Sequence, residues 1–139
     1  ITLIRILDLL GKSPDLIPMS SSLFIVKADR QQVDRLNLVI DYTITNFAAK
    51  ITLEDIASLS NMSVSNFCKY FKGRMKKTYV QYLTEVRIGM SCKLLIENRL
   101  SVHQIAFESG FVNISNFNRA FKLTKQMTPL SYRKSYHID

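Results

Sequence analysis

The sequence has 139 residues, of which 47% are hydrophobic and 22% charged, values that fit one globular domain and exclude a disordered chain. Nineteen Lys and Arg against eleven Asp and Glu give a net charge of +8, which favours a polyanionic partner. The longest apolar run, Leu23–Val26, is too short to cross a membrane, which takes about 18 residues. Cys68 and Cys92 form no CxxC pair, so we expect no metal site, no disulfide framework and a reducing, cytoplasmic location.

The first 27 residues differ in pattern from the rest of the chain. Apolar residues at helical spacing run to Gly11, and residues 12–27 then combine two prolines with three consecutive serines. We interpret 1–27 as the end of a preceding unit plus a linker, and 28–139 as a separate domain. The positive charge supports this division, because residues 1–26 are neutral. We also expect the chain to be part of a longer protein.

Helix signals recur along residues 28–139. Apolar residues at intervals of three and four from Val33 to Phe47 indicate the first helix. Six later helix starts carry an N-cap side chain, and in three of them Asp or Gln follows three positions later. These N-cap residues are Thr52, Ser63, Thr78, Ser101, Asn113 and Thr128. The pattern predicts an all-α domain of about seven helices, over 29–48, 53–59, 64–75, 79–98, 102–108, 114–125 and 129–135.

One segment is repeated. Residues 65–72 match residues 115–122 at an offset of 50, and the preceding Ile-Ala pair recurs at an offset of 49. Each copy has a short helix, a tight turn and a second helix, which is the pattern of a helix-turn-helix. Asn61 and Gly110 supply the residue that tolerates positive φ in each turn.

The second helix of each copy has two distinct faces. Phe67 and Phe71 in one copy, and Phe117 and Phe121 in the other, are spaced to face a core. Polar and basic side chains on the opposite face suit a DNA major groove, because Asn pairs with adenine, Arg with guanine and Lys with phosphate. The candidate DNA-binding residues are Ser65, Asn66, Lys69, Lys72, Ser115, Asn116, Asn118, Arg119 and Lys122.

These faces lie in two basic clusters without acidic residues, one over 69–77 and one over 119–134, the second including Arg133. The helix between the copies spans about 30 Å, close to the roughly 34 Å between successive major-groove faces. One chain could therefore place the second helix of each copy in adjacent turns of the major groove. We expect this linking helix to pack through one apolar face. That face carries Tyr79, Leu83, Val86, Met90 and Leu94.

Residues 33–133, about 100 of the 139, resemble the DNA-binding domain of the AraC/XylS family of bacterial transcription regulators. The match is strongest over Ile105–Phe111, Ser115–Lys122 and Thr128–Arg133. The resemblance implies two homeodomain-like helix-turn-helix subdomains joined by a long linking helix, with 64–75 and 114–125 as recognition helices. Lys76 and Gln126 stand where the family has glycine after these helices, at an expected cost of about 1 kcal/mol.

The resemblance also implies partners. These are double-stranded promoter DNA, RNA polymerase, and a second copy bound through a preceding regulatory and dimerisation domain, of which 1–22 would be the end. It implies a sequence-specific regulator, in most cases an activator, without a cofactor.

Three other classes of function fit the sequence less well. A basic helical RNA-binding or non-specific nucleic-acid-binding domain stays open as the alternative, although it explains neither the repeat nor the turns. An enzyme is rejected, because the only histidines are His103 and His137 and there is no glycine-rich phosphate loop. Two copies are too few for a solenoid that binds proteins.

Overall fold

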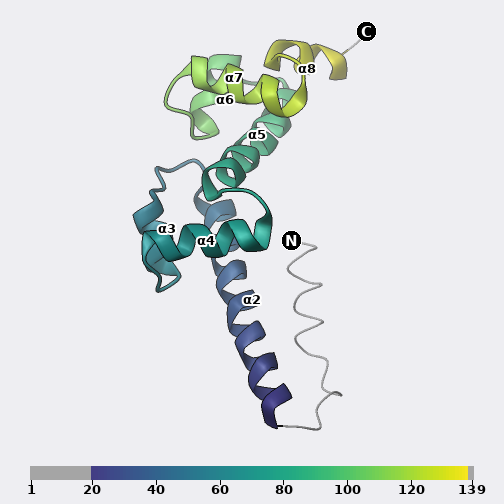
Figure 1. Cartoon of the computed structure of the whole chain (residues 1–139). Helices are drawn as coiled ribbons and strands as arrows, with labels where there is room; N and C mark the ends of the chain where they lie inside the picture. Colours follow the sequence, from purple (N-terminus) through teal and green to yellow (C-terminus); the bar gives the residue numbers. More distant parts are fainter. Residues whose placement is uncertain (1–19, 138–139) are drawn as a thin grey trace. The chain divides into compact units, whose positions relative to one another are not determined.

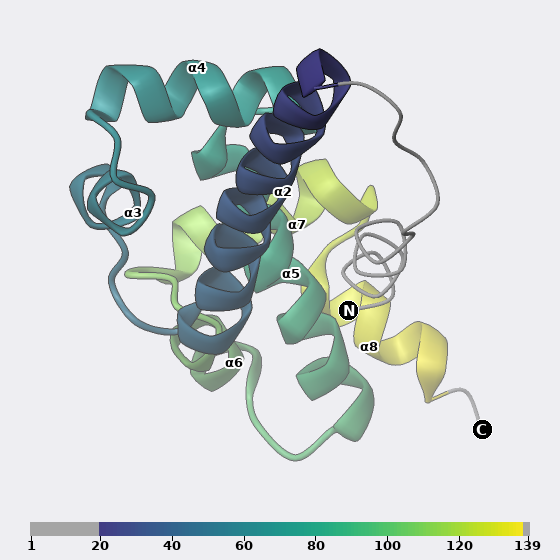
Figure 2. The same cartoon turned by 90° about the horizontal axis from the view of Figure 1, so that it is seen from below.

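The computed structural model describes residues 20–137, which form seven helices and no strand (Figure 1 and Figure 2). The helix expected within residues 1–10 lies outside this range. The chain divides into two compact parts, Ile1–Asp41 and Tyr42–Asp139. The helices are α2 (Ser20–Asn46), α3 (Leu53–Leu59), α4 (Val64–Met75), α5 (Tyr79–Glu97), α6 (Val102–Glu108), α7 (Ile114–Lys125) and α8 (Pro129–Tyr136). Among residues 20–137, none of the helices combines the length and the hydropathy that a membrane span requires.

The predicted all-α fold with two helix-turn-helix units is confirmed. The bounds of α3, α4, α6 and α7 agree with the prediction, and α5 and α8 each differ by one residue. The first predicted helix is wrong at its start, because α2 begins at Ser20 rather than at residue 29. Residues 20–27 are thus helical and not an irregular linker. No proline follows Pro18 in this stretch, and serine is only mildly unfavourable inside a helix.

All six predicted N-cap residues cap their helices. Reciprocal capping boxes form at Thr52, Thr78 and Ser101. In each box the side-chain oxygen of the third helical residue accepts a hydrogen bond from the backbone N–H of the N-cap residue. In α3 the backbone N of Asp55 lies 3.1 Å from Thr52 Oγ1, and Thr52 N lies 3.1 Å from Asp55 Oδ2. The other three caps accept from the third residue of their helices. Local side-chain chemistry therefore fixes where these helices begin.

The two turns have the same hydrogen bonds. The backbone N of Met62 donates to Ala57 O at 2.9 Å, and Phe111 N donates to Ala106 O at 3.0 Å. Each bond closes a Schellman motif, which needs a residue with positive φ after the helix. Asn61 (φ 56°) and Gly110 (φ 95°) take that role, as predicted.

The linking helix α5 does not pack through a single stripe. It contacts α4 near its start and α6, α7 and α8 along the rest of its length (Figure 1). Tyr79 and Leu83 are buried as predicted, but Val86 and Met90 are only half-buried, and Ile88 is fully buried instead. Because neighbours cover α5 from different directions, its buried face changes along the helix. The predicted one-sided face is therefore wrong beyond Leu83.

Two aromatic cores hold the repeats. In the first, the rings of Phe67 and Phe71 pack on Tyr79, with centroids 5.7 and 5.4 Å apart. The Tyr79 hydroxyl lies 2.7 Å from Thr43 Oγ1, at the end of α2. In the second, Phe117 and Phe121 are buried with residues of α5 and α6, and Tyr132 packs against them. Both cores place α4 and α7 with one face inward and one outward.

Candidate nucleic-acid interface

The candidate residues lie on the outward faces of α4 and α7. The four phenylalanines of these helices are 0–1% exposed, and all nine candidate side chains are exposed. A helix turns about 100° per residue, so Arg119, two positions from Phe117 and from Phe121, points directly away from the core. Lys69 has the same place in α4. Figure 1 shows α4 and α7 running in the same general direction.

Local structure fixes both ends of each helix. The N-caps Ser63 and Asn113 accept from the backbone N of Asn66 and of Asn116, at 3.2 and 2.8 Å. At the other end, Lys76 (φ 61°) and Gln126 (φ 63°) are left-handed and donate their backbone N–H to the last turn. These are the two positions without the expected glycine. The outward residues are therefore presented on helices with defined ends.

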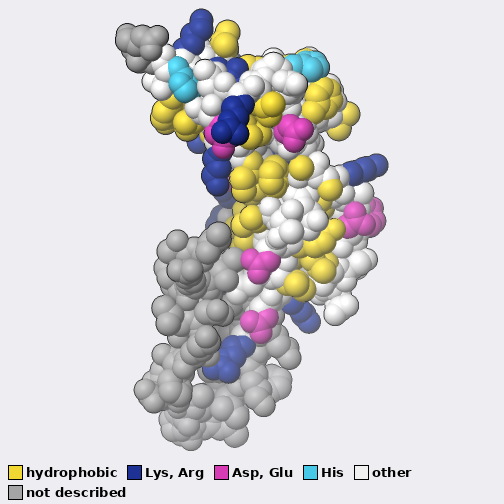
Figure 3. Space-filling view, turned by 180° about the vertical axis from the view of Figure 1, so that it is seen from behind, with side chains coloured by type: hydrophobic (Ala, Val, Ile, Leu, Met, Phe, Trp, Pro, Cys, Tyr) yellow, Lys and Arg dark blue, Asp and Glu magenta, His cyan; other side chains and the backbone are white. Residues whose placement is uncertain are grey.

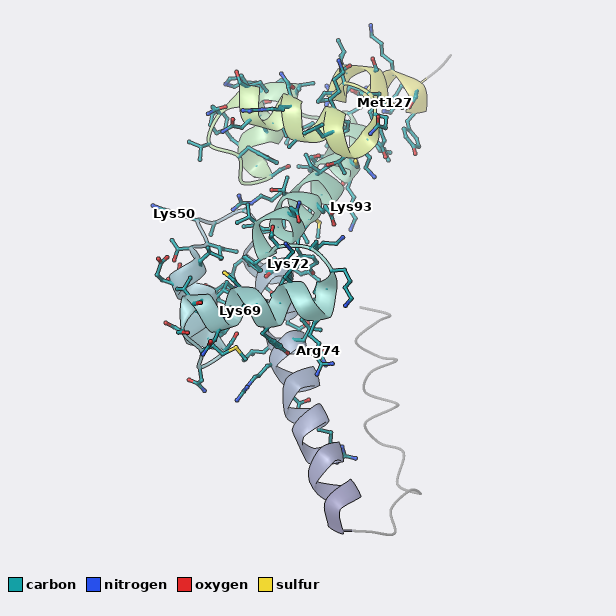
Figure 4. The ribbon with its side chains drawn as sticks, in the orientation of Figure 1. Lys50, Lys69, Lys72, Arg74, Lys93 and Met127 are labelled. Atoms are coloured by element: carbon teal, nitrogen blue, oxygen red, sulfur yellow. The ribbon has the colours of Figure 1, made fainter. Side chains whose placement is uncertain are left out.

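The outward faces are basic. Figure 4 shows Lys69 and Lys72 along α4, and Arg119 and Lys122 have the corresponding places in α7. Arg74 and Lys125, in the last turns, lie toward the phenylalanine side of their helices. Neither helix contains an acidic residue. Basic side chains in the last turn of each helix also interact favourably with its negative C-terminal end. Seen from behind, basic, acidic and apolar side chains are interspersed (Figure 3).

Lys77 and Arg133, which belong to the predicted basic clusters, are held by contacts within the protein. Lys77 Nζ forms an ion pair with Glu85 Oε2 at 2.7 Å. Arg133 donates from Nη2 to Leu100 O and from Nε to Leu95 O, the latter at 3.5 Å. It thus ties α8 to the end of α5 and to the loop that follows, so it does not belong to a free basic surface.

Arg87 plays a similar part near the first repeat, and no local sequence pattern marks it. Its Nε donates to Phe47 O at 2.8 Å and its Nη2 to Ala49 O at 3.0 Å. Partial burial lowers the pKa of this guanidinium from its usual value, but an arginine stays charged in any physiological range. Arg87 therefore holds the segment before α3 against α5.

One contact within α7 joins two candidate residues. Arg119 Nη2 donates to Asn116 Oδ1 at 2.7 Å. The corresponding α4 residues, Asn66 and Lys69, show no such bond in the part of the chain that the structure describes. The two outward faces therefore differ in chemistry, although their backbones match.

Neither cysteine belongs to a group of ligands. Cys92 is buried, Cys68 is half-buried, and both are free thiols. Within residues 20–137, no three His, Cys, Asp or Glu side chains come together to hold a metal ion. The nine candidate side chains lie instead on the outward faces of α4 and α7, all of them exposed.

Known proteins share this arrangement. The HTH-type transcriptional regulator YdeC of Bacillus subtilis is 36% identical over 100 residues, which cover 72% of this chain and 34% of YdeC. The chain thus spans about a third of that relative's length. A DNA-binding transcriptional dual regulator from Escherichia coli K-12 is 26% identical with a TM-score of 0.67, covering 91% of this chain and 100% of that one.

The DNA-binding domain of AdpA, solved in complex with a target DNA, shares the fold. Its TM-score is 0.70 at 22% identity, and the match covers 74% of this chain and 93% of that one. A family model described as a helix-turn-helix domain matches residues 56–135, more than half of the chain. That range includes both turns and both helices with basic outward faces. The chain therefore belongs to the AraC/XylS family of helix-turn-helix transcription regulators.

Proposed function

We propose that this chain binds a bipartite promoter site, with α4 and α7 in adjacent major-groove turns on one side of the duplex, and thereby regulates transcription. The observation that carries the proposal is the repeated outward face, basic and free of acidic residues in both helices. The linking helix α5 has 19 residues and is about 28 Å long. That length suits the roughly 34 Å repeat of the major groove.

The division of labour within each face follows from side-chain chemistry. Lys72 and Lys122, near the helix ends, are placed to contact phosphates, which fixes position without reading sequence. Asn66, Lys69, Asn116 and Arg119 have the reach to meet base edges, and the serines are short enough to contact only backbone or water. Activation of transcription, a contact with RNA polymerase and dimerisation through a further domain are part of the proposal for the whole protein. It includes no catalytic step.

RNA binding is the second candidate. RNA readers commonly stack exposed aromatic side chains on unpaired bases. In α4 and α7 all four phenylalanines are buried and Tyr70 is half-buried, so neither helix offers a fully exposed ring for stacking. This burial favours DNA.

The test is a fluorescence-anisotropy titration of the chain against random DNA duplexes and matched RNA at two salt concentrations, followed by sequencing of the retained DNA. We expect enrichment of two short boxes about one helical turn apart. Tight RNA binding, or DNA binding with a salt slope but no enriched sequence, would overturn the proposal. Lys72→Ala is the matched control, because it should weaken binding to all DNA alike and reduce the salt slope by about one.

A further inference from the structure

Asn116 and Arg119 form one unit on the outward face of α7. Three positions apart on a helix, they lie about 60° from each other around its axis, and the bond from Arg119 Nη2 to Asn116 Oδ1 is 2.7 Å long. Both side chains are exposed. The backbone N of Asn116 is itself held by Asn113 Oδ1 at 2.8 Å. The N-cap therefore holds the backbone at Asn116, and the side chain of Asn116 accepts from the guanidinium at the centre of the outward face.

This bond changes what Asn116 offers to a base. Bidentate pairing with adenine needs the amide oxygen and the amide NH₂ to meet the same base edge. Here the oxygen is directed at Arg119, which leaves the NH₂ as the group turned away from it. Arg119 keeps its remaining N–H groups, enough for bidentate pairing with O6 and N7 of guanine. Positions 116 and 119 together present hydrogen-bond donors.

The first recognition helix lacks this arrangement. Asn66 and Lys69 have the same spacing, but no hydrogen bond joins them in the described part of the chain. A lysine ammonium is a point charge on a flexible stem, whereas the guanidinium is a planar fork whose orientation matters. Orienting the side chain at the centre of the face therefore has a consequence for base selection only in α7.

We infer that Asn116 is a positioning residue that orients Arg119 toward guanine, and that α7 reads a base edge made of acceptors rather than pairing Asn116 with adenine. The inference rests on the proposed function, because it assumes that α7 enters the major groove. It assigns the stricter base selection to the second box of the bipartite site. The first box is then recognised with weaker base preference through Asn66 and Lys69.

The test is a double-mutant cycle in base preference. From the site selected by the unmodified chain, duplexes are made with each of the four bases at every position of the box that α7 contacts. Arg119→Ala should abolish the preference for guanine at one base pair. Asn116→Ala should reduce that preference at the same base pair by roughly three- to tenfold, part of the 5- to 150-fold that a bidentate pair supplies. In the Arg119→Ala background, Asn116→Ala should change the base preference at that base pair by less than about twofold.

Asn116→Asp is the conservative variant. It keeps an oxygen for Arg119 but loses the amide donors, so guanine should still be preferred while overall affinity falls through repulsion from phosphates. Asn66→Ala with Lys69→Ala is the matched cycle in α4, where we expect additive effects. Alanine is a good helix former, and far-UV circular dichroism checks that each variant keeps its helices.

Several results would overturn the inference. One is that the losses of base preference in Asn116→Ala and Arg119→Ala are additive. Another is that Asn116→Ala loses base preference at a different base pair from Arg119→Ala. A third is that the unmodified chain prefers adenine at a base pair and Asn116→Ala abolishes that preference. Unchanged base preference in Arg119→Ala would also overturn it. Each of these requires a chain that selects sequence, so they differ from failure of the proposed function, in which the unmodified chain enriches no site.

Discussion

The first helix-turn-helix (α3 and α4) and the second (α6 and α7) share a turn with the same hydrogen bonds, yet their tolerance of change differs. The first turn uses Asn61 at φ 56° and the second Gly110 at φ 95°. A Cβ added at Gly110 would lie 2.6 Å from Phe47 O and 2.7 Å from Arg87 Nε. The second turn thus packs against the segment before α3, where Arg87 is anchored. It is a structural junction as well as a turn.

The outward faces of α4 and α7 differ in their side chains. Lys69 in the first helix-turn-helix corresponds to Arg119 in the second, and Gly73 corresponds to Leu123, which is 73% exposed. The second face therefore has a planar, oriented cation and an additional apolar side chain. A repeat can thus keep its core and caps while its two copies diverge on the surface and in the contacts of the turn.

The largest expected effect concerns α5, which both cores share. Ile88→Asp would place a charge in the core of the second helix-turn-helix, where Ile88 is 0% exposed, and should lower the free energy of unfolding by about 4 kcal/mol or more. Met90→Asp should cost less than half as much, because Met90 is half-buried. Urea denaturation followed by circular dichroism measures both. Equal losses would contradict the packing of α5 described above.

The second prediction contrasts the turns. Gly110→Ala should destabilise the protein by about 3 kcal/mol, because it adds backbone strain at positive φ to a clash with Phe47 and Arg87. Asn61→Gly should change stability by less than about 0.5 kcal/mol, since asparagine already tolerates this conformation. Thermal and urea unfolding of both variants are the measurement. If Gly110→Ala were as mild as Asn61→Gly, the junction at the second turn would not exist.

The third prediction concerns the ends of the recognition helices, where the two copies should respond alike. Lys76→Gly and Gln126→Gly should each raise the free energy of unfolding by about 0.5–1 kcal/mol, because both residues are left-handed and glycine adopts this conformation without strain. Asn98→Gly at the end of α5 is the control (φ 58°), with little change expected. A stabilisation confined to one recognition helix would show that the two ends differ in ways their φ angles do not reveal.

Signals confined to a few neighbouring residues were readable from the sequence. Each capping box spans four residues, and each turn needs one residue with positive φ, so both turns and the bounds of the six helices after α2 were predicted to within one residue. The burial of α5 was not, because it depends on helices that approach from different directions. Arg87 and Arg133 were also missed as anchors. Their carbonyl partners lie 33–40 residues away, and no local pattern marks such contacts.

The candidate interface shows the same limit. The exposure of all nine side chains follows from their spacing relative to the phenylalanines, and so was predictable. The bond between Asn116 and Arg119 is local, yet the sequence alone does not tell whether an exposed asparagine meets its neighbour or a base. Which base each residue reads stays a prediction.

The smallest expected effect is a response to acid in only one of the two helix-turn-helix units. Hydrogen bonds from the backbone and side chain of Thr52 lower the pKa of Asp55 below its ordinary value of 3.8. Its capping contribution is therefore present above that value and is lost as the pH falls below it. The second unit's capping box uses Gln104, which does not titrate. Hydrogen exchange is measured at pH 5.5 and 3 and corrected for intrinsic rates. Protection of the Thr52 amide should fall between the two pH values, whereas protection of the Ser101 amide should not change. Asp55→Gln should remove this difference between Thr52 and Ser101.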